Sequence, residues 1–185
     1  MERIQDDGME HAADPDQVRD AKRGDEAAFT TLLRPLVEPA YRLAAGMLQD
    51  RQLAQDAVQE AAVKAWRKIH QLRGGTEMRP WFFGIVANEC RTTRRGRWWS
   101  VLKIDAERRS IETPDDVAVR GIDLRNALKR LRPDQRLVVV LYFYLDLPLE
   151  EIATIAGASF AAVRARLYRA IRELRADFPM TEVKA

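Results

Sequence analysis

The segment WFFGIVANECRTTRR brings together the side-chain types that single-stranded nucleic acid requires. On a helical wheel, Trp81, Gly84, Asn88, Arg91 and Arg95 fall on one face at steps of three and four residues. An aromatic ring can stack on a base, a glycine allows close backbone approach, an amide can pair with a base edge, and guanidinium groups can hold phosphates. The face predicts binding to opened DNA. The alternative is a core tryptophan followed by a solvated, arginine-rich helix end.

The other side of this helix, and the loop before it, complete the prediction. Phe82, Ile85, Val86 and Cys90 share the opposite side and are expected in the core. The preceding glycine-containing loop could close over an extruded base. Its candidate contact residues are Arg73, Gly74, Gly75, Thr76, Met78 and Arg79.

A second helix, in DRQLAQDAVQEAAVKAWRKIHQL, has one apolar stripe and one polar, acidic face. The expected core stripe is Val58, Ala61, Ala62, Ala65, Trp66 and Ile69. The opposite face carries Gln52, Gln55, Asp56, Gln59 and Glu60, with the two acids one turn apart. Such a face is typical of either a solvated surface or a docking surface for a basic helical partner.

The C-terminal segment LPLEEIATIAGASFAAVRARLYRAIRELRADF has the pattern of a helix-turn-helix. Gly157 can provide the tight turn, and Ser159 can cap the second helix. That helix buries a stripe of Val163, Leu167, Ala170, Ile171, Leu174 and Phe178. Off the stripe lie Arg164, Tyr168, Arg169, Arg172 and Arg175. This geometry suits a DNA major groove, and a solvated amphipathic hairpin is the alternative.

Helical periodicity runs through almost every patterned segment, which predicts an all-α fold. The expected architecture is two small helical domains joined by a flexible linker, the second containing the helix-turn-helix. We expect an acidic disordered tail at 1–17, a first domain at 18–99, a linker at 100–120, a second domain at 121–179 and a short tail at 180–185. Trp98 and Trp99 are expected where the first domain gives way to the linker.

Composition favours a polyanionic partner and excludes several function classes. The 185 residues carry a net charge of +3, but residues 1–20 hold seven acids against two arginines, which leaves +8 on the remainder. One cysteine and two histidines exclude an internal disulfide and any zinc-ligand spacing. No catalytic constellation, cofactor motif, signal peptide or membrane span is recognisable, so we expect a cytoplasmic protein that is not an enzyme.

Three ordered blocks carry a resemblance to a known family: DRQLAQDAVQEAAVKAW, RPWFFGIVANECRTTRR and LEEIATIAGASFAAVRARLYRAIRELR. Together the blocks resemble the extracytoplasmic-function (ECF) group of bacterial sigma factors, within the sigma-70 superfamily. The resemblance implies that the first domain docks on the clamp helices of the largest RNA polymerase subunit, and melts and captures the minus-ten promoter element. It implies that the second domain binds the minus-thirty-five duplex and the flap of the second-largest subunit. An anti-sigma factor is a further implied partner, and the linker is expected to thread toward the polymerase active-site and RNA-exit path.

Residue roles follow from the resemblance by position. The acidic helix face would contact polymerase, through Gln52, Gln55, Asp56, Gln59 and Glu60. The minus-ten strand would meet the loop from Arg73 to Arg79 together with Trp81, Asn88, Arg91 and Arg95. The minus-thirty-five duplex would meet Ser159, Arg164, Ala165, Tyr168, Arg169 and Arg172.

The chain departs from the family pattern in the recognition helix. Where members often have a glycine, a threonine and then a serine, this chain has Ala161, Ala162 and Ala165. Hydroxyl contacts are therefore missing, and we expect arginines and DNA shape to carry the readout.

Two other function classes remain open on the sequence alone. One is a two-domain helix-turn-helix regulator that acts on duplex operators without polymerase, and the other is a helical adaptor for an acidic protein. The apolar run VVVLYFYLDL could offer surface to an anti-sigma factor. A buried helix with Leu137, Val138, Leu141 and Tyr144 inward is the favoured interpretation.

Overall fold

The structure is a computed structural model that describes residues 14–72, 77–101 and 126–177 and, for residues 96–101 and 176–177, the backbone alone. Every regular element in these ranges is helical, and the ranges contain no strand. The all-α prediction is therefore confirmed. None of the described helices has the length and apolar character that a bilayer span requires.

In the described residues, the first domain has four α-helices and one short turn. They are α1 (Pro15–Lys22), α2 (Glu26–Leu48), α3 (Arg51–Lys68), the 3₁₀ turn η1 (Ile69–Gln71) and α4 (Met78–Val101). An aspartate side chain accepts hydrogen bonds from the first turn of α1, α2 and α3, at Asp14, Asp25 and Asp50 respectively. These carboxylates cap amide groups that have no partner within the helix, so they fix where each helix begins.

The second domain contains the helix-turn-helix. After a helical turn at 126–130 come α6 (Pro133–Val139), the π-helical turn η2 (Val140–Tyr144), α7 (Leu149–Ala156) and α8 (Phe160–Asp177). Gly157 ends α7 in the left-handed conformation, with φ of 60°. The Ser159 hydroxyl then accepts a hydrogen bond from the Ala162 amide at 3.3 Å, and so caps α8 as expected.

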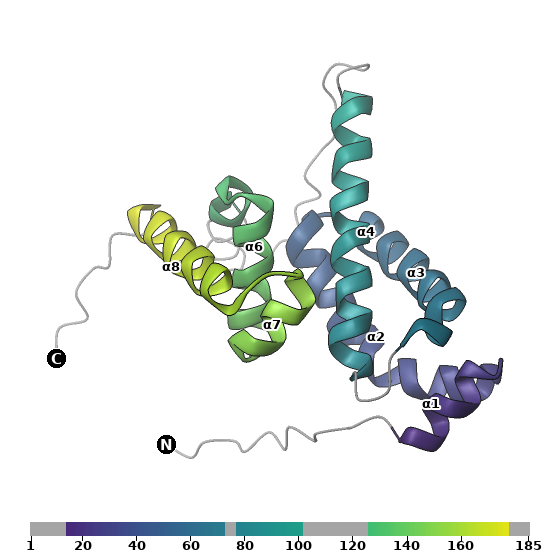
Figure 1. The fold of residues 1–185 in the computed structure, drawn as a ribbon. Helices are drawn as coiled ribbons and strands as arrows, with labels where there is room; N and C mark the ends of the chain where they lie inside the picture. The colour runs from purple at the N-terminus through teal and green to yellow at the C-terminus, as the bar shows by residue number, and fades with distance from the viewer. Residues whose placement is uncertain (1–13, 73–76, 102–125, 178–185) are drawn as a thin grey trace, which may run out of the picture.

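The two domains pack directly against each other. In Figure 1, α4 stands between α3 on one side and α7 on the other, and helix-to-helix contacts join α4 to α7 and α2 to both α6 and η2. Buried side chains of both domains belong to one continuous hydrophobic core. The sequence indicated two tethered domains but gave no sign of this packing between them.

Close approach at Gly46 shows how tightly α2 meets the second domain. A Cβ atom placed on Gly46 would lie 2.9 Å from both methyl groups of Val140 and 3.5 Å from its Cβ. One residue further along α2, the Met47 carbonyl accepts a hydrogen bond from Arg136 Nη1 at 2.9 Å. A glycine is thus required where η2 crosses α2, because any side chain would have to displace Val140.

Several boundaries differ from the sequence prediction. Helix α1 begins at Pro15, inside the segment predicted as a disordered tail. The α4 backbone continues through Trp98 and Trp99 to Val101, past the predicted start of the linker. Four ranges lie outside the described residues: 1–13, 73–76, 102–125 and 178–185. They include Phe178 and most of the predicted tails, loop and linker.

The apolar run at the end of α6 is only partly buried. Leu137, Val138 and Leu141 belong to the core as predicted, but Tyr144 is 59% exposed. The chain widens into a π-helical turn at 140–144, which changes the angular step between residues and rotates Tyr144 out of the buried stripe.

Candidate nucleic-acid and polymerase interfaces

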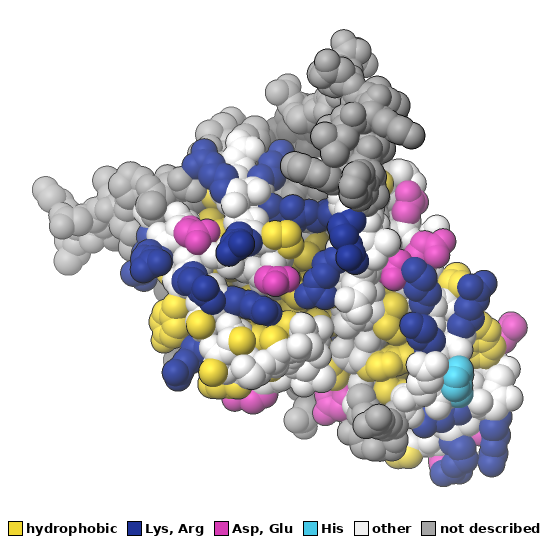
Figure 2. Space-filling view, turned by 45° about the horizontal axis from the view of Figure 1, so that its top comes forward, with side chains coloured by type: hydrophobic (Ala, Val, Ile, Leu, Met, Phe, Trp, Pro, Cys, Tyr) yellow, Lys and Arg dark blue, Asp and Glu magenta, His cyan; other side chains and the backbone are white. Residues whose placement is uncertain are grey.

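Helix α8 presents a basic face to solvent. Its buried stripe is Val163, Leu167 and Ala170, as predicted. The side chains on the other side are exposed: Arg164, Ala165, Tyr168, Arg169, Arg172 and Arg175. Figure 2 shows Lys and Arg side chains gathered over this part of the surface. The exposed face follows the tight turn at Gly157, which is the arrangement that a major-groove recognition helix requires.

Helix α3 lies on the other side of α4 from α8 (Figure 1), and one of its faces is polar and acidic. Gln52, Gln55, Asp56, Gln59 and Glu60 are all exposed. The amide of Gln52 donates to the Asp56 carboxylate at 3.0 Å. The acidic face is therefore accessible along its length, and the opposite stripe of α3 contributes Val58, Ala61 and Ala65 to the core.

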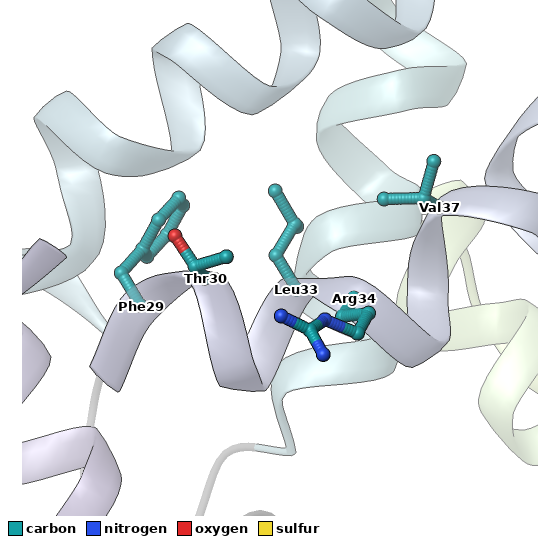
Figure 3. A pocket seen from close by; sticks show the side chains of 5 residues that line it. All are labelled: Phe29, Thr30, Leu33, Arg34 and Val37. Carbon is teal, nitrogen blue, oxygen red and sulfur yellow. The ribbon is translucent and has the colours of Figure 1, made fainter. Parts of the chain in front are cut away.

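An apolar hollow on α2 lies close to Trp66, near the C-terminal end of α3. Figure 3 shows the side chains that line the hollow: Phe29, Thr30, Leu33, Arg34 and Val37. An adjoining depression is lined in part by Trp66 of α3, whose ring lies 5.0 Å from that of Phe29. Val63 of α3, 45% exposed, follows Glu60 by about one turn. The α3 face thus changes from acidic to apolar toward Trp66, a feature that the sequence reasoning missed.

Several of the candidate strand-binding residues on α4 are less exposed than the arginines on the basic face of α8. Asn88 and Arg95 are exposed, whereas Trp81 is half-buried against the core. The Asn88 carboxamide oxygen accepts a hydrogen bond from Arg91 Nη1 at 2.9 Å. Met78 was predicted to contact DNA, but its side chain is only 3% exposed and packs into the core. We therefore leave Met78 out of the site.

Two of the candidate arginines on the first domain pair with carboxylates of the second. Arg79 Nε donates to Glu151 Oε1 of α7 at 2.8 Å, and its Nη2 donates to Oε2 at 2.5 Å. Arg91 Nη2 lies 3.7 Å from Asp134 of α6. The second Asp134 oxygen lies 3.8 Å from Arg166 of α8. The arrangement brings the arginines together with partners that the sequence analysis did not single out.

A buried arginine, Arg136, also joins the two domains. Arg136 is 4% exposed, and besides Met47 it donates to the carbonyls of Leu128 at 2.6 Å and Lys129 at 2.8 Å. Burial, together with the charge of nearby Arg94, lowers the pKa of Arg136 to about 10. The guanidinium therefore stays charged at neutral pH, and backbone carbonyls compensate its burial. A sequence signal existed, because Arg136 directly precedes the apolar run LVVV.

The part of the chain that the structure describes offers no cluster of metal ligands, and its cysteine is buried. Burial raises the pKa of the Cys90 thiol to about 12, so this thiol stays protonated and unreactive. Among the described residues, no cluster of three His, Cys, Asp or Glu side chains could hold a metal ion.

Two family models match the chain, the first over most of the first domain and the second over most of the second domain. "Sigma-70 region 2" matches residues 31–100 and "Sigma-70, region 4" matches residues 122–174. An ECF RNA polymerase sigma factor of Mycobacterium tuberculosis, SigL, is 30% identical over 164 residues, which cover 82% of this chain and 92% of the relative. The chain belongs to the ECF sigma factors. Such factors direct RNA polymerase to promoters and initiate transcription there, and this is the function class of the chain.

Other comparisons agree with this membership. The sigma factor SigV of Bacillus subtilis is 28% identical over 154 residues, covering 83% of this chain and 93% of the relative. The fold matches that of the sigma factor RpoE of Bartonella quintana, solved in complex with the anti-sigma factor NepR. That match has a TM-score of 0.70 and 24% identity, and it covers 83% of this chain and 98% of the solved one. The sigma factor thus has the fold expected of its family.

Proposed function

We propose that this sigma factor divides promoter recognition among three helix faces, on α3, α4 and α8. The observation that carries the proposal is the separation of an exposed acidic face on α3 from an exposed basic face on α8, with α4 between them. A single chain so arranged can hold a basic protein surface and DNA at the same time, because the two faces do not compete.

The α3 face docks on the clamp helices of the largest polymerase subunit. Asp56 and Glu60, with the three glutamines, supply electrostatic complementarity to a basic helical surface. Val63 and the hollow beside Trp66 extend the docking surface with apolar area at its end. Apolar contact flanked by charge is typical of specific protein interfaces.

The α4 face captures the opened minus-ten strand. Trp81 supplies a ring for base stacking, Asn88 pairs with a base edge, and Arg79, Arg91 and Arg95 hold phosphates. The loop residues Arg73, Gly74, Gly75 and Thr76 precede this face in the sequence and close over an extruded base.

The α8 face binds the minus-thirty-five duplex, and the second domain also contacts the polymerase flap. Arg164, Tyr168, Arg169 and Arg172 lie together on the exposed side of α8. Arg169 Nε donates to the Ala165 carbonyl at 3.1 Å, which orients this guanidinium along the helix. With alanines at 161, 162 and 165, direct readout rests on the arginines and shape readout contributes the rest.

The proposal includes the compartment and the domain limits. The sigma factor acts in the cytoplasm, has no catalytic activity of its own, and is held inactive by an anti-sigma factor. Its first domain takes in the helices from α1, which begins at Pro15, to α4, which ends at Val101, and its second lies within residues 121–179; the linker between them threads toward the polymerase active-site path.

A double charge reversal on α3 tests polymerase docking. Asp56→Arg with Glu60→Arg places two positive charges against a basic surface, which is expected to weaken association with core polymerase by about a hundredfold. The matched control is Asp16→Arg with Asp20→Arg, a reversal at the same spacing on α1. Intact polymerase association and promoter-specific transcription in the α3 variant would favour a regulator that binds duplex operators without polymerase.

A further inference from the structure

Four arginines gather at the junction of the two domains. Asp134 of α6 lies 3.7 Å from Arg91 of α4 and 3.8 Å from Arg166 of α8. Arg94 follows Arg91 by about one turn of α4. Its charge contributes to the lowered pKa of Arg136 in α6, so these two guanidinium groups lie near each other. We call the four arginines the junction cluster.

The junction cluster has more positive charge than its surroundings compensate. Among the described residues, Asp134 is the one acidic side chain that forms an ion pair with any of the four arginines, so four positive charges face one negative charge. Both distances to Asp134 are longer than a hydrogen bond. Backbone carbonyls accept the N–H groups of Arg136, but they do not neutralise its charge. Because like charges held this close repel each other, the cluster favours a bound anion.

Hydrogen-bond donors without acceptors occur on both sides of the cluster. Arg94 Nη1 is buried and has no hydrogen-bond partner in the described part of the chain. A buried N–H group of this kind costs free energy unless a polar atom accepts from it. Across the junction, Arg166 pairs with Asp134 at 3.8 Å but makes no hydrogen bond to it. An anion with several oxygen atoms would satisfy donors from α4 and α8 at once.

Partial burial of the cluster limits the size of its ligand. The side chains of Arg91 and Arg166 are only 25% and 26% exposed, and Arg94 is half-buried. The arginines on the basic face of α8 are instead fully open to solvent. A small anion can reach recessed guanidinium groups, whereas the broad backbone of a DNA duplex meets the exposed face of α8.

We propose that the junction cluster binds a diphosphate group, either free as inorganic pyrophosphate or carried by a nucleotide. Arginine suits this ligand because its planar fork of N–H groups matches the oxygen atoms of a phosphate. A diphosphate carries roughly three negative charges at neutral pH, which balances the cluster. One phosphate contacts Arg94 and the other contacts Arg166. Neither arginine has a part in the promoter contacts proposed above, so this binding goes beyond the sigma function.

Calorimetric titration of the full chain tests the site. Pyrophosphate, ADP, sulfate and chloride are compared at equal ionic strength and without divalent cations. We expect saturable binding of a diphosphate at a single site, and much weaker binding of sulfate and chloride. Pyrophosphate binding tighter than that of ADP identifies the free anion as the ligand, and the reverse order identifies a nucleotide. Absence of saturable diphosphate binding, or sulfate binding of equal strength, would overturn the proposal.

Removal of single guanidinium groups tests the residues. Arg94→Gln and Arg166→Gln should each weaken diphosphate binding by about tenfold or more, the worth of a hydrogen bond to a charged group. The two substitutions lie on different helices, so misfolding of one variant leaves the other to decide. Arg175→Gln is the matched control, because it removes the same charge from the exposed end of α8 and should leave affinity nearly unchanged. Equal losses in all three would mean nonspecific attraction and would overturn the site.

DNA is the alternative occupant of the junction cluster. A labelled short single strand and a labelled duplex are titrated with wild-type protein and with Arg94→Gln and Arg166→Gln. Unchanged DNA affinity, together with weakened diphosphate binding, supports a site for small anions. Weakened DNA affinity, with no diphosphate binding by wild type, would assign the cluster to the DNA interface instead. These titrations contain no polymerase, so failure of the proposed promoter function would not alter their outcome.

Discussion

Helices α4 and α8 both carry arginines suited to DNA, but the two sets differ in what surrounds them. The α8 arginines 164, 169 and 172 are exposed. On α4, Arg91 is paired with a carboxylate of the second domain, and so is Arg79 in the first turn. We therefore propose that α8 is open to duplex DNA in the free protein, whereas strand capture by Arg79 and Arg91 requires their carboxylate partners to move away. The difference matches the order of events at a promoter, since duplex binding precedes opening.

The largest expected effect removes the base-stacking ring and amide from α4. Trp81→Ala with Asn88→Ala should lower transcription from an intact promoter more than from a pre-melted one, because stacking contributes about 1–3 kcal/mol per base. Duplex binding through α8 should change little. Transcription on the two templates with core polymerase measures the effect. Equal losses on both would mean that α4 plays no special part in opening.

Removal of α8 arginines should act on duplex binding instead. Arg164→Ala and Arg169→Ala should each weaken duplex affinity and lower the logarithmic salt slope by about 0.9, the contribution of one phosphate contact. Titration of labelled duplex over a range of salt concentrations measures both quantities. Arg23→Ala, an exposed arginine at the C-terminal end of α1, is the control. An unchanged slope in both α8 variants would show that these arginines do not contact phosphates.

Salt should distinguish the paired arginines from the exposed ones. Salt weakens arginine–phosphate contacts, but it also weakens the carboxylate pairs that compete with them. Single-strand binding by wild-type protein should therefore have a shallower salt slope than binding by the Glu151→Gln, Asp134→Asn variant. The shift is at most about 0.7 per exchanged phosphate contact. Identical slopes would show that the carboxylates do not compete with DNA.

The smallest expected effect concerns the turn that positions α8. Gly157 has φ of 60°, so Gly157→Ala should destabilise the second domain by about 1 kcal/mol. Thermal unfolding measures the loss, and Ala158→Gly, at the adjacent residue, provides a comparison for flexibility alone. A variant as stable as wild type would indicate that the turn can relax without strain.

The sequence predicted the elements that have strong periodicity. The buried stripes of α3 and α8 and the exposed acidic and basic faces follow from helical spacing, because each stripe packs within its own domain. The tight turn at Gly157 and the Ser159 cap followed from local chemistry as well.

What escaped sequence reasoning depends on contacts between the domains. The spacing of Trp81 and Gly84 in the sequence is the same whether DNA or another helix covers them, so the pattern alone does not distinguish the two partners. Arg136 is likewise buried where it donates to the Met47 carbonyl of α2, a partner distant in the sequence. The outward turn of Tyr144 arises from a π-helical turn, which no spacing rule at 3.6 residues per turn predicts.

Run-off transcription by core polymerase on genomic fragments, with and without this sigma factor, tests the central claim most directly. The account predicts discrete transcripts with fixed 5′ ends that appear only with the sigma factor. They should be lost in the Asp56→Arg, Glu60→Arg variant and retained in the Asp16→Arg, Asp20→Arg control. A protein that binds duplex fragments specifically but yields no such transcripts would contradict the account.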